Sequence, residues 1–208
     1  MRAAPRAAPN ATVLRGRAKR KPRVGVSGHP AMAASTSAPF FTVDETALAD
    51  LNAFLRDARE LVRARDSNAK KINKTPRAER VTLVLGNEAA DLDSVACAIS
   101  LAYALHEAND DASRAYVPVV CVPREDFSLR ADARWLLESV GVDVDALTFA
   151  GEVAFGDASR PIVDDRLRLV LVDHNALASK SEYASFASAV DAVVDHHEDE
   201  KKYPATAA

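Results

Sequence analysis

The chain has 208 residues, of which 48% are hydrophobic and 27% charged, and its formal net charge is −3. This composition is typical of one α/β domain with additional segments, and the length is sufficient to bury a core. This net charge excludes a broad positively charged surface for binding nucleic acid and leaves only local basic patches. No apolar run approaches the roughly 18 to 20 residues that a membrane span requires. We therefore expect a soluble protein whose function depends on local motifs.

Residues 1–40 differ in composition from the rest of the chain. They contain eight Arg or Lys residues and many Ala, Ser and Pro residues, and the first acidic residue of the chain is Asp44. An Arg-rich, acid-free segment is typical of an organelle transit peptide, which would direct the protein to a chloroplast or mitochondrion. The alternatives are a disordered basic arm, or a true start at Met32, on a cytoplasmic protein.

Residues 41–79 are predicted to form an amphipathic helix and a linker. Between Thr42 and Arg65, apolar residues recur at helical spacing, and Asp44 and Glu45 lie near the expected N-terminus. The stretch from Ser67 to Glu79 is polar and rich in Lys, and we interpret it as a solvent-facing linker.

From Val81 onward, strands and helices are predicted to alternate. The expected strands are Val81–Leu85, Tyr116–Val122 with an irregular start because of Pro118, Leu147–Phe149, Leu167–Val172 and Val190–Val194. The expected helices are Ser94–Glu107, Ala131–Val140, which Gly141 closes, and a short one at Ser181–Ala187. This alternation predicts an α/β fold with a doubly wound, mostly parallel sheet over residues 80–208. Cys97 and Cys121 lie in apolar runs and are predicted to be buried thiols.

Three of these strands run directly into polar residues. The first is followed by Asp91 and Asp93, the fourth by Asp173, His174 and Asn175, and the fifth by Asp195, His196 and His197. Ligands of open α/β sheets bind at the carboxyl ends of the strands. Carboxylates select Mg²⁺ or Mn²⁺, and added imidazole shifts the preference toward Mn²⁺, Co²⁺ or Zn²⁺. We therefore predict a two-ion site that activates a water and holds phosphoryl oxygens.

Simpler roles exist for single residues of this set. Without a metal, Asp93 would cap the following helix, and His174 would pair with a neighbouring carboxylate or support the site from behind. The sequence has no Gly-x-Ser-x-Gly motif and no P-loop, so no side-chain nucleophile is indicated.

The motifs together resemble the DHH phosphoesterase superfamily, which is named for the sequence present here as Asp195-His196-His197. The stretches Gly86–Ser94, Pro123–Arg130 and Val172–Asn175 are most similar to its exopolyphosphatase and prune-like branch, related to the manganese-dependent (family II) inorganic pyrophosphatases. The similarity covers about residues 80–204. It implies four metal ligands, namely Asp91, Asp93, Asp173 and His196. It further implies that Asp173 bridges two divalent ions (Mn²⁺ or Mg²⁺, with Co²⁺ as a further option).

The resemblance also implies roles around the ions. His197 would contact the phosphate being cleaved, and Asp195 would orient the histidines. The pyrophosphatases have His at the position of Asn87, which we expect to be a weaker oxygen ligand, favouring polyphosphate over pyrophosphate. Arg124 and Arg130 would either contact phosphate or hold their loop through neighbouring acidic residues, Glu125 and Asp126.

The implied activity is release of terminal phosphate from inorganic polyphosphate by a metal-activated water. The alternatives are a pyrophosphatase or phosphodiesterase of the same superfamily, or an inactive prune-like interaction module. The family has a fourth motif and a C-terminal substrate-binding domain, and this sequence ends at Ala208 before both. We therefore expect a truncated DHH domain, whose own activity the sequence leaves open together with its oligomeric state.

Overall fold

The protein contains a five-stranded parallel sheet in the order β3-β2-β1-β4-β5. This computed structural model describes residues 42–66, 80–153 and 166–203. The strands are β1 (Arg80–Leu85), β2 (Arg114–Val120), β3 (Thr148–Phe149), β4 (Leu167–Val172) and β5 (Val190–Val194). The predicted α/β fold with a parallel sheet is confirmed. The predicted basic arm at 1–40 and the linker at 67–79 lie outside the described residues.

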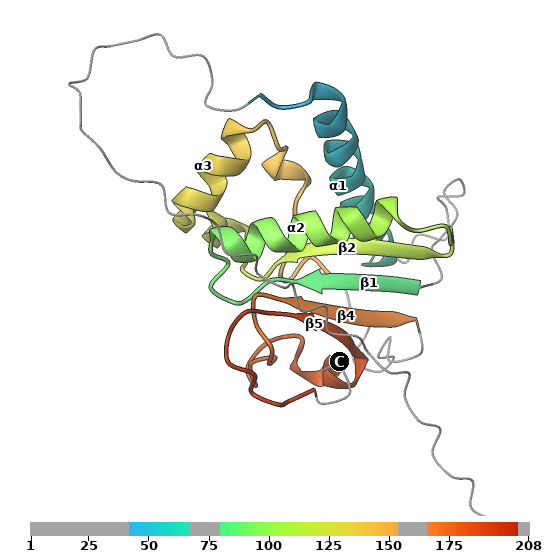
Figure 1. The fold of residues 1–208 in the computed structure, drawn as a ribbon, viewed down its shortest axis with the longest axis vertical. Helices are drawn as coiled ribbons and strands as arrows, with labels where there is room; N and C mark the ends of the chain where they lie inside the picture. The colour runs from blue at the N-terminus through green and yellow to red at the C-terminus, as the bar shows by residue number, and fades with distance from the viewer. Residues whose placement is uncertain (1–41, 67–79, 154–165, 204–208) are drawn as a thin grey trace, which may run out of the picture.

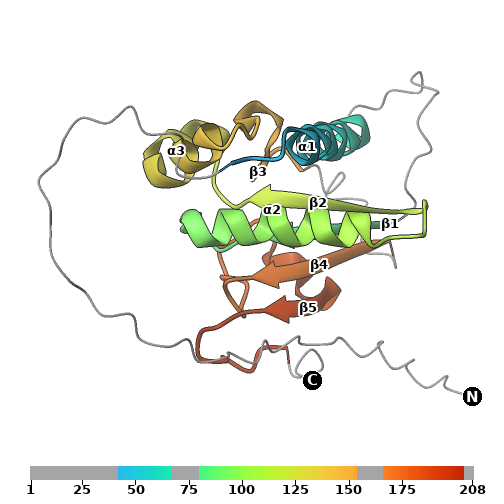
Figure 2. The same cartoon turned by 45° about the horizontal axis from the view of Figure 1, so that its top comes forward.

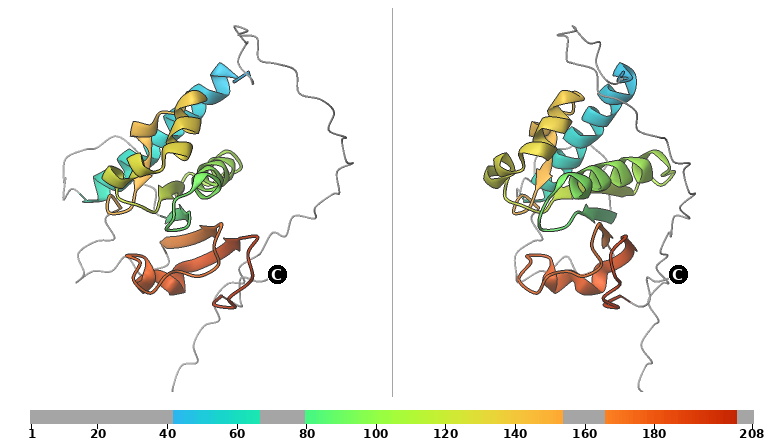
Figure 3. Two further views of the ribbon diagram at one scale, coloured as in Figure 1. Left: turned by 90° about the vertical axis from the view of Figure 1, so that its left-hand side faces the viewer. Right: turned by 60° about the vertical axis from the view of Figure 1, so that its left-hand side comes forward.

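Among the described residues, three α-helices lie at the β1–β2 side of the sheet, whereas a short 3-10 helix, η3 (Ala184–Ala189), packs against β4. The α-helices are α1 (Glu45–Asp66), α2 (Leu92–Glu107) and α3 (Ala131–Ser139), and two further short 3-10 helices are η1 (Arg124–Leu129) and η2 (Val144–Ala146). Helix α2 lies across the sheet (Figure 1), and α1 lies beside α3 and the segment that follows it (Figure 3). Within the described ranges, no helix combines the length and apolar character that crossing a membrane requires.

The amphipathic helix α1 is part of the core. Its Phe54 and Leu55 are buried with α2 and α3, while Ala58 and Val62 pack with the residues on the other face of the strands. Parallel strands are buried on both faces, so the apolar runs of β1 and β4 supply both clusters. Burial of this apolar stripe, rather than helix propensity, is what holds α1 in place.

Among the element boundaries that differ from the prediction, those of β2 and α2 have an identifiable cause. Strand β2 begins at Arg114 and runs unbroken through Pro118. The oxygen of Val120 accepts from the N–H of Ala150 on the β3 side. Pro118 faces that same side and lies one residue before Val119, where the pairing with β3 begins. The missing N–H of Pro118 therefore removes no ladder hydrogen bond. Helix α2 begins at Leu92 because Asp91, rather than the expected Asp93, is its N-cap.

The sheet order places the three acidic strand ends together. From the central β1, the chain builds outward first to β2 and β3 and later to β4 and β5, so the order reverses between β1 and β4. Such a switch point opens a crevice at the carboxyl ends of the strands. Figure 2 shows the arrowheads pointing to the edge where α2 begins.

Candidate metal centre

The loop between β1 and α2 is held by hydrogen bonds to the first turn of the helix. The Asp91 carboxylate accepts from the N–H of Ser94 at 3.3 Å, and the N–H of Asn87 donates to the buried Ser94 hydroxyl at 2.6 Å. A Cβ at position 86 would lie 2.5 Å from that hydroxyl, so this close approach requires Gly86. Asp91 is thereby fixed half-buried, and Asp93 follows it as an exposed residue of the first turn.

Asn87 connects this loop to the end of β4. Its side-chain oxygen accepts from the N–H of Ala90 at 3.0 Å, and its Nδ2 donates to Asp173 at 2.8 Å and to Asp91 at 3.4 Å. A backbone N–H can only donate, so this contact determines which way the amide points. Asn87 thus offers its N–H groups to the carboxylates, where we had expected an oxygen ligand.

Asp173 lies at the centre of the cluster and is only 7% exposed. Its φ of +60° is in the left-handed region, which Asp tolerates better than most residues, and its N–H donates to the oxygen of Val194 at 3.0 Å. Burial raises the pKa of Asp173, and the nearby carboxylates of Asp93 and Asp91 raise it further. A residue held this way by the neighbouring strand presents its carboxylate in one direction.

Asp195 organises the two histidines that follow β5. Its Oδ1 accepts from Nδ1 of His197 at 2.7 Å and from the N–H groups of His196 and His197 at 2.9 and 3.3 Å. Nδ2 of Asn175 donates to its Oδ2 at 2.6 Å. Burial acts to raise the pKa of Asp195, but these hydrogen bonds outweigh it and lower that pKa, while the bond to Asp195 raises the pKa of His197. Both shifts favour a charged pair.

The two imidazoles stand side by side above Asp173. Their ring centroids are 4.2 Å apart, and Nε2 of His196 lies 3.2 Å from the Asp173 Oδ1, against 3.9 Å for Nδ1 of His197. The side chains of His196 and His197 are 74% and 54% exposed. His196 is therefore turned toward the central carboxylate, whereas Nδ1 of His197 is turned toward Asp195 and its Nε2 makes no hydrogen bond to the described residues.

Two groups of ligand atoms share Asp173. One consists of Asp91, Asp93 and Asp173, the other of Asp173, His196 and His197, and within each group the atoms lie within 4.8 Å of one another. In the part of the chain that the structure describes, no Lys or Arg forms an ion pair with these three carboxylates. The donor set of carboxylates and imidazoles, which none of the described Lys or Arg residues neutralises, suits hard or borderline divalent cations.

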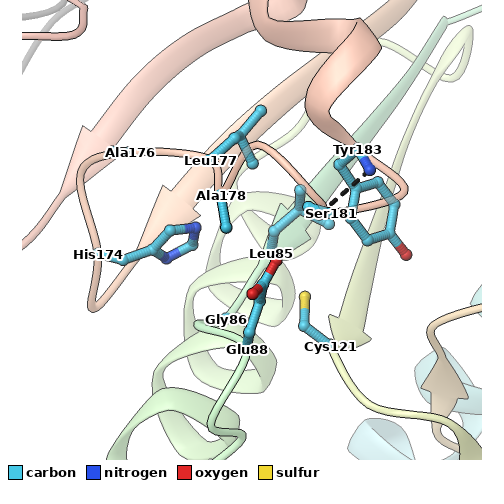
Figure 4. A pocket seen from close by; sticks show the side chains of 10 residues that line it. All are labelled: Leu85, Gly86, Glu88, Cys121, His174, Ala176, Leu177, Ala178, Ser181 and Tyr183. Atoms are coloured by element: carbon cyan, nitrogen blue, oxygen red, sulfur yellow. Dashed lines mark hydrogen bonds between the residues drawn. The ribbon is translucent and has the colours of Figure 1, made fainter.

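His174 belongs to neither group. Its Nδ1 lies 2.9 Å from the oxygen of Val172, which can only accept, so the ring carries its proton there. Figure 4 shows the ring at the wall of a pocket of about 150 Å³ that Glu88 and Cys121 also line. The structure thus places His174 beside the centre, with its second nitrogen turned into a different cavity.

Arg124 holds its loop, but through a partner that the sequence did not suggest. Its Nε and Nη2 donate to the carboxylate of Glu152 at 2.6 and 2.9 Å, and the guanidinium lies 4.3 Å from the centre of the Phe149 ring. Glu125 and Asp126 are not its partners. Arg130 instead donates from Nε to the oxygen of Ala89, in the loop that carries Asp91.

The expected burial of both cysteines is wrong for Cys97, which is exposed. Cys97 follows Asp93 by four residues on α2 and so shares its face of the helix. Cys121 is half-buried, and burial raises the pKa of its thiol to about 12. Both thiols are free of disulfides.

The sequence pattern indicated no role for Ser94 and Asn175, which support the centre, or for Glu152, which holds Arg124. Asn175 lies in the same strand-end motif as Asp173, and its position was the signal that could have identified it. Its Oδ1 also accepts from the N–H of Glu200 at 3.0 Å, so one amide connects the ends of β4 and β5.

A cluster of carboxylates and imidazoles at the switch point of a parallel sheet defines an α/β domain with a set of potential metal ligands. The N-terminal domain of the DHH family matches residues 81–208, and the chain belongs to this family. It is 32% identical over 150 residues to a Schizosaccharomyces pombe protein provisionally named an exopolyphosphatase, covering 72% of this chain and 36% of that protein.

The chain is also similar to mammalian proteins. It is 38% identical over 121 residues to Exopolyphosphatase PRUNE1 of Rattus norvegicus and of Homo sapiens, covering 58% of this chain and 25% of each relative. The chain therefore spans only about a quarter to a third of the length of these curated relatives.

Proposed function

We propose that this domain carries the metal centre of an exopolyphosphatase, which releases the terminal phosphate of inorganic polyphosphate by attack of an activated water. The observation that carries the proposal is the pair of ligand groups sharing Asp173 at the switch point. The names of the relatives support the substrate class. Pyrophosphate and phosphodiesters are the competing substrates of the same centre.

Different residues of the cluster would hold the two cations. Asp91 and Asp93 would hold one cation, His196 the other, and Asp173 both. When bound, two Mn²⁺ or Mg²⁺ ions supply Lewis acidity toward phosphoryl oxygens and make a water more acidic. Because the carboxylates are fixed by the α2 N-terminus and by β4, little reorganisation accompanies binding.

His197 is suited to contact the phosphoryl group. Its Nδ1 is held by Asp195, and the raised pKa favours the imidazolium, whose Nε2–H can donate to a phosphate oxygen. Asp195 then acts as a positioning residue, because it fixes the ring through Nδ1.

Phosphate release from polyphosphate in the presence of Mn²⁺ or Mg²⁺ tests this function. We expect the rate to be lost in Asp173→Ala and in His196→Ala, and to be kept in the control Asp50→Ala, which alters an exposed carboxylate on α1. An unchanged rate in both site variants would defeat the proposal. Parallel assays with pyrophosphate and a phosphodiester rank the substrates.

The exposure of the histidine side favours a second candidate function. Side chains of His196 and His197 that are 74% and 54% exposed leave that half of the centre open to water. A metal-binding interaction module without turnover would tolerate this openness. Calorimetry separates the two: tight binding of two Mn²⁺ ions without phosphate release supports the module.

A further inference from the structure

The segment between β2 and α3 carries two arginines whose surroundings differ. Arg124 donates from Nε and Nη2 to Glu152 and from Nη2 to the oxygen of Leu147 at 2.5 Å, and its guanidinium lies over the Phe149 ring. Arg130, which immediately precedes α3, makes a single side-chain hydrogen bond to the described residues, from Nε to the oxygen of Ala89. Both terminal nitrogens of Arg130 are therefore available.

The position of Arg130 relates it to the metal centre. Ala89 lies two residues before Asp91, in the loop whose conformation Asn87 and Ser94 determine. The contact therefore holds the guanidinium against the carboxylate-bearing loop. None of the acidic residues described nearby, on η1 or in the first turn of α3, forms an ion pair with Arg130.

An arginine restrained through Nε, with two free terminal nitrogens, has the geometry for bidentate binding of a phosphate. The strand order places it on the opposite side of Asp173 from His197, because β1 and β5 flank β4. A chain of phosphates crossing the centre from β5 toward β1 would meet His197 first and Arg130 later.

We propose that Arg130 binds a phosphoryl group of the substrate on the β1 side of the centre, an inference that rests on the proposed function. Arg124 has the separate task of holding the loop. The charges at the site favour this role of Arg130. Each further phosphate of the substrate is negative and would be repelled by the carboxylates, and the guanidinium would offset that repulsion.

Binding of imidodiphosphate, which resists hydrolysis, tests this role by calorimetry at saturating Mn²⁺. We expect Arg130→Gln, which keeps an N–H for the Ala89 oxygen, to weaken anion binding about 10-fold or more, the loss typical of a charge-assisted contact. Arg130→Lys should recover part of the affinity through its charge alone. Affinity for Mn²⁺ should be unchanged in both.

The matched control is Arg134→Gln, one turn further along α3, where the guanidinium pairs with Glu138 on the surface. It should bind the anion as the unaltered chain does. Undiminished anion binding in Arg130→Gln would overturn the inference, as would a parallel loss of Mn²⁺ affinity, which would show that Arg130 only shapes the loop. If the unaltered chain with Mn²⁺ binds no imidodiphosphate, the proposed function fails as well.

Discussion

The two sides of Asp173 are built differently. On the β1 side, Asp91 is a helix N-cap, and the loop before it is tied to Ser94 and cross-linked by Asn87. On the β5 side, two largely exposed histidines depend on one carboxylate, Asp195. The carboxylates on the β1 side are therefore held by a helix N-terminus and its loop. The histidines on the β5 side are held by the hydrogen bonds of one buried side chain, Asp195.

The largest effect is expected where the two sides meet. Asp173→Asn removes the charge that both ligand groups share, and Asn tolerates the left-handed backbone at this position. Since changes behind a ligand already cost about 10- to 100-fold in metal affinity, we expect a loss of more than about 100-fold at both Mn²⁺ sites. Calorimetry with Asp50→Asn as control measures it. Retention of one tight site would show that the two groups do not share a ligand.

A smaller and one-sided effect is expected from Asp195→Asn. The amide oxygen of Asn can still accept from His197 and from the turn after β5, but without the negative charge these three hydrogen bonds weaken. The Nδ2 of Asn175 also loses its acceptor, because an NH2 group takes the place of Oδ2. We expect about 10- to 100-fold weaker Mn²⁺ binding at the histidine group, with the carboxylate group unaffected. Asp191→Asn, on the same strand beside Arg168, is the control. Equal weakening of both sites would argue against the independence of the two sides.

On the β1 side, Asn87→Ala should affect the metal-free protein most. The variant loses donors to two carboxylates, and hydrogen bonds to charged groups contribute about 1.5–3 kcal/mol. Because cations would take over the role of those donors, we expect a larger drop in Tm in EDTA than in Mn²⁺. Thermal melts in both conditions provide the measurement, and equal drops would contradict the expectation.

In the metal-free protein, the carboxylates of Asp91, Asp93 and Asp173 repel one another, so removing one of these charges should increase the stability of the fold. The pKa of Asp173 is raised, so the folded state binds more protons than the unfolded state above the ordinary pKa, and stability falls as pH rises through that range. Metal-free Asp173→Asn should therefore melt roughly 2–4 °C higher at neutral pH, the shift for about 1 kcal/mol in a domain of this size. A lower Tm would show that hydrogen bonds to the carboxylate outweigh its repulsion.

The smallest effect concerns pH on the β5 side. The raised pKa of His197 means that its contribution to stability is complete below about pH 6.5, the ordinary value for His, and is lost as pH rises through its folded pKa. For Asp195 the lowered pKa gives a contribution that is lost in acid. NMR titration of the metal-free protein should show His197 titrating above the ordinary value, and returning to it in Asp195→Asn. An equal pKa in both proteins would contradict the pairing.

The parts of the fold that sequence predicted well are those with local causes. Strands β4 and β5 have the predicted boundaries because β-branched apolar runs end there at charged residues. The switch-point rule also predicted that Asp91, Asp93, Asp173, His196 and His197 lie close together, and the structure brings them into two groups that share Asp173.

What the sequence missed depends on contacts between distant segments. The pairing of Arg124 with Glu152 spans 28 residues, and no local pattern indicates that a residue in a predicted loop will meet that arginine. The orientation of the Asn87 amide depends on the N–H of Ala90, which only the folded loop places there. Cys97 was misjudged because its apolar neighbours in sequence do not share its face of α2.

The hydrogen bond between Asn87 and Asp173 joins residues that are 86 positions apart in the sequence. It connects the end of the central strand β1 to the end of β4. Closing so long a segment is a slow, entropically costly step of folding. The ligand groups therefore come into existence only when β4 and β5 have docked on β1. Divalent cations would therefore bind the complete sheet in preference to any partly assembled one, and this preference would stabilise the folded state.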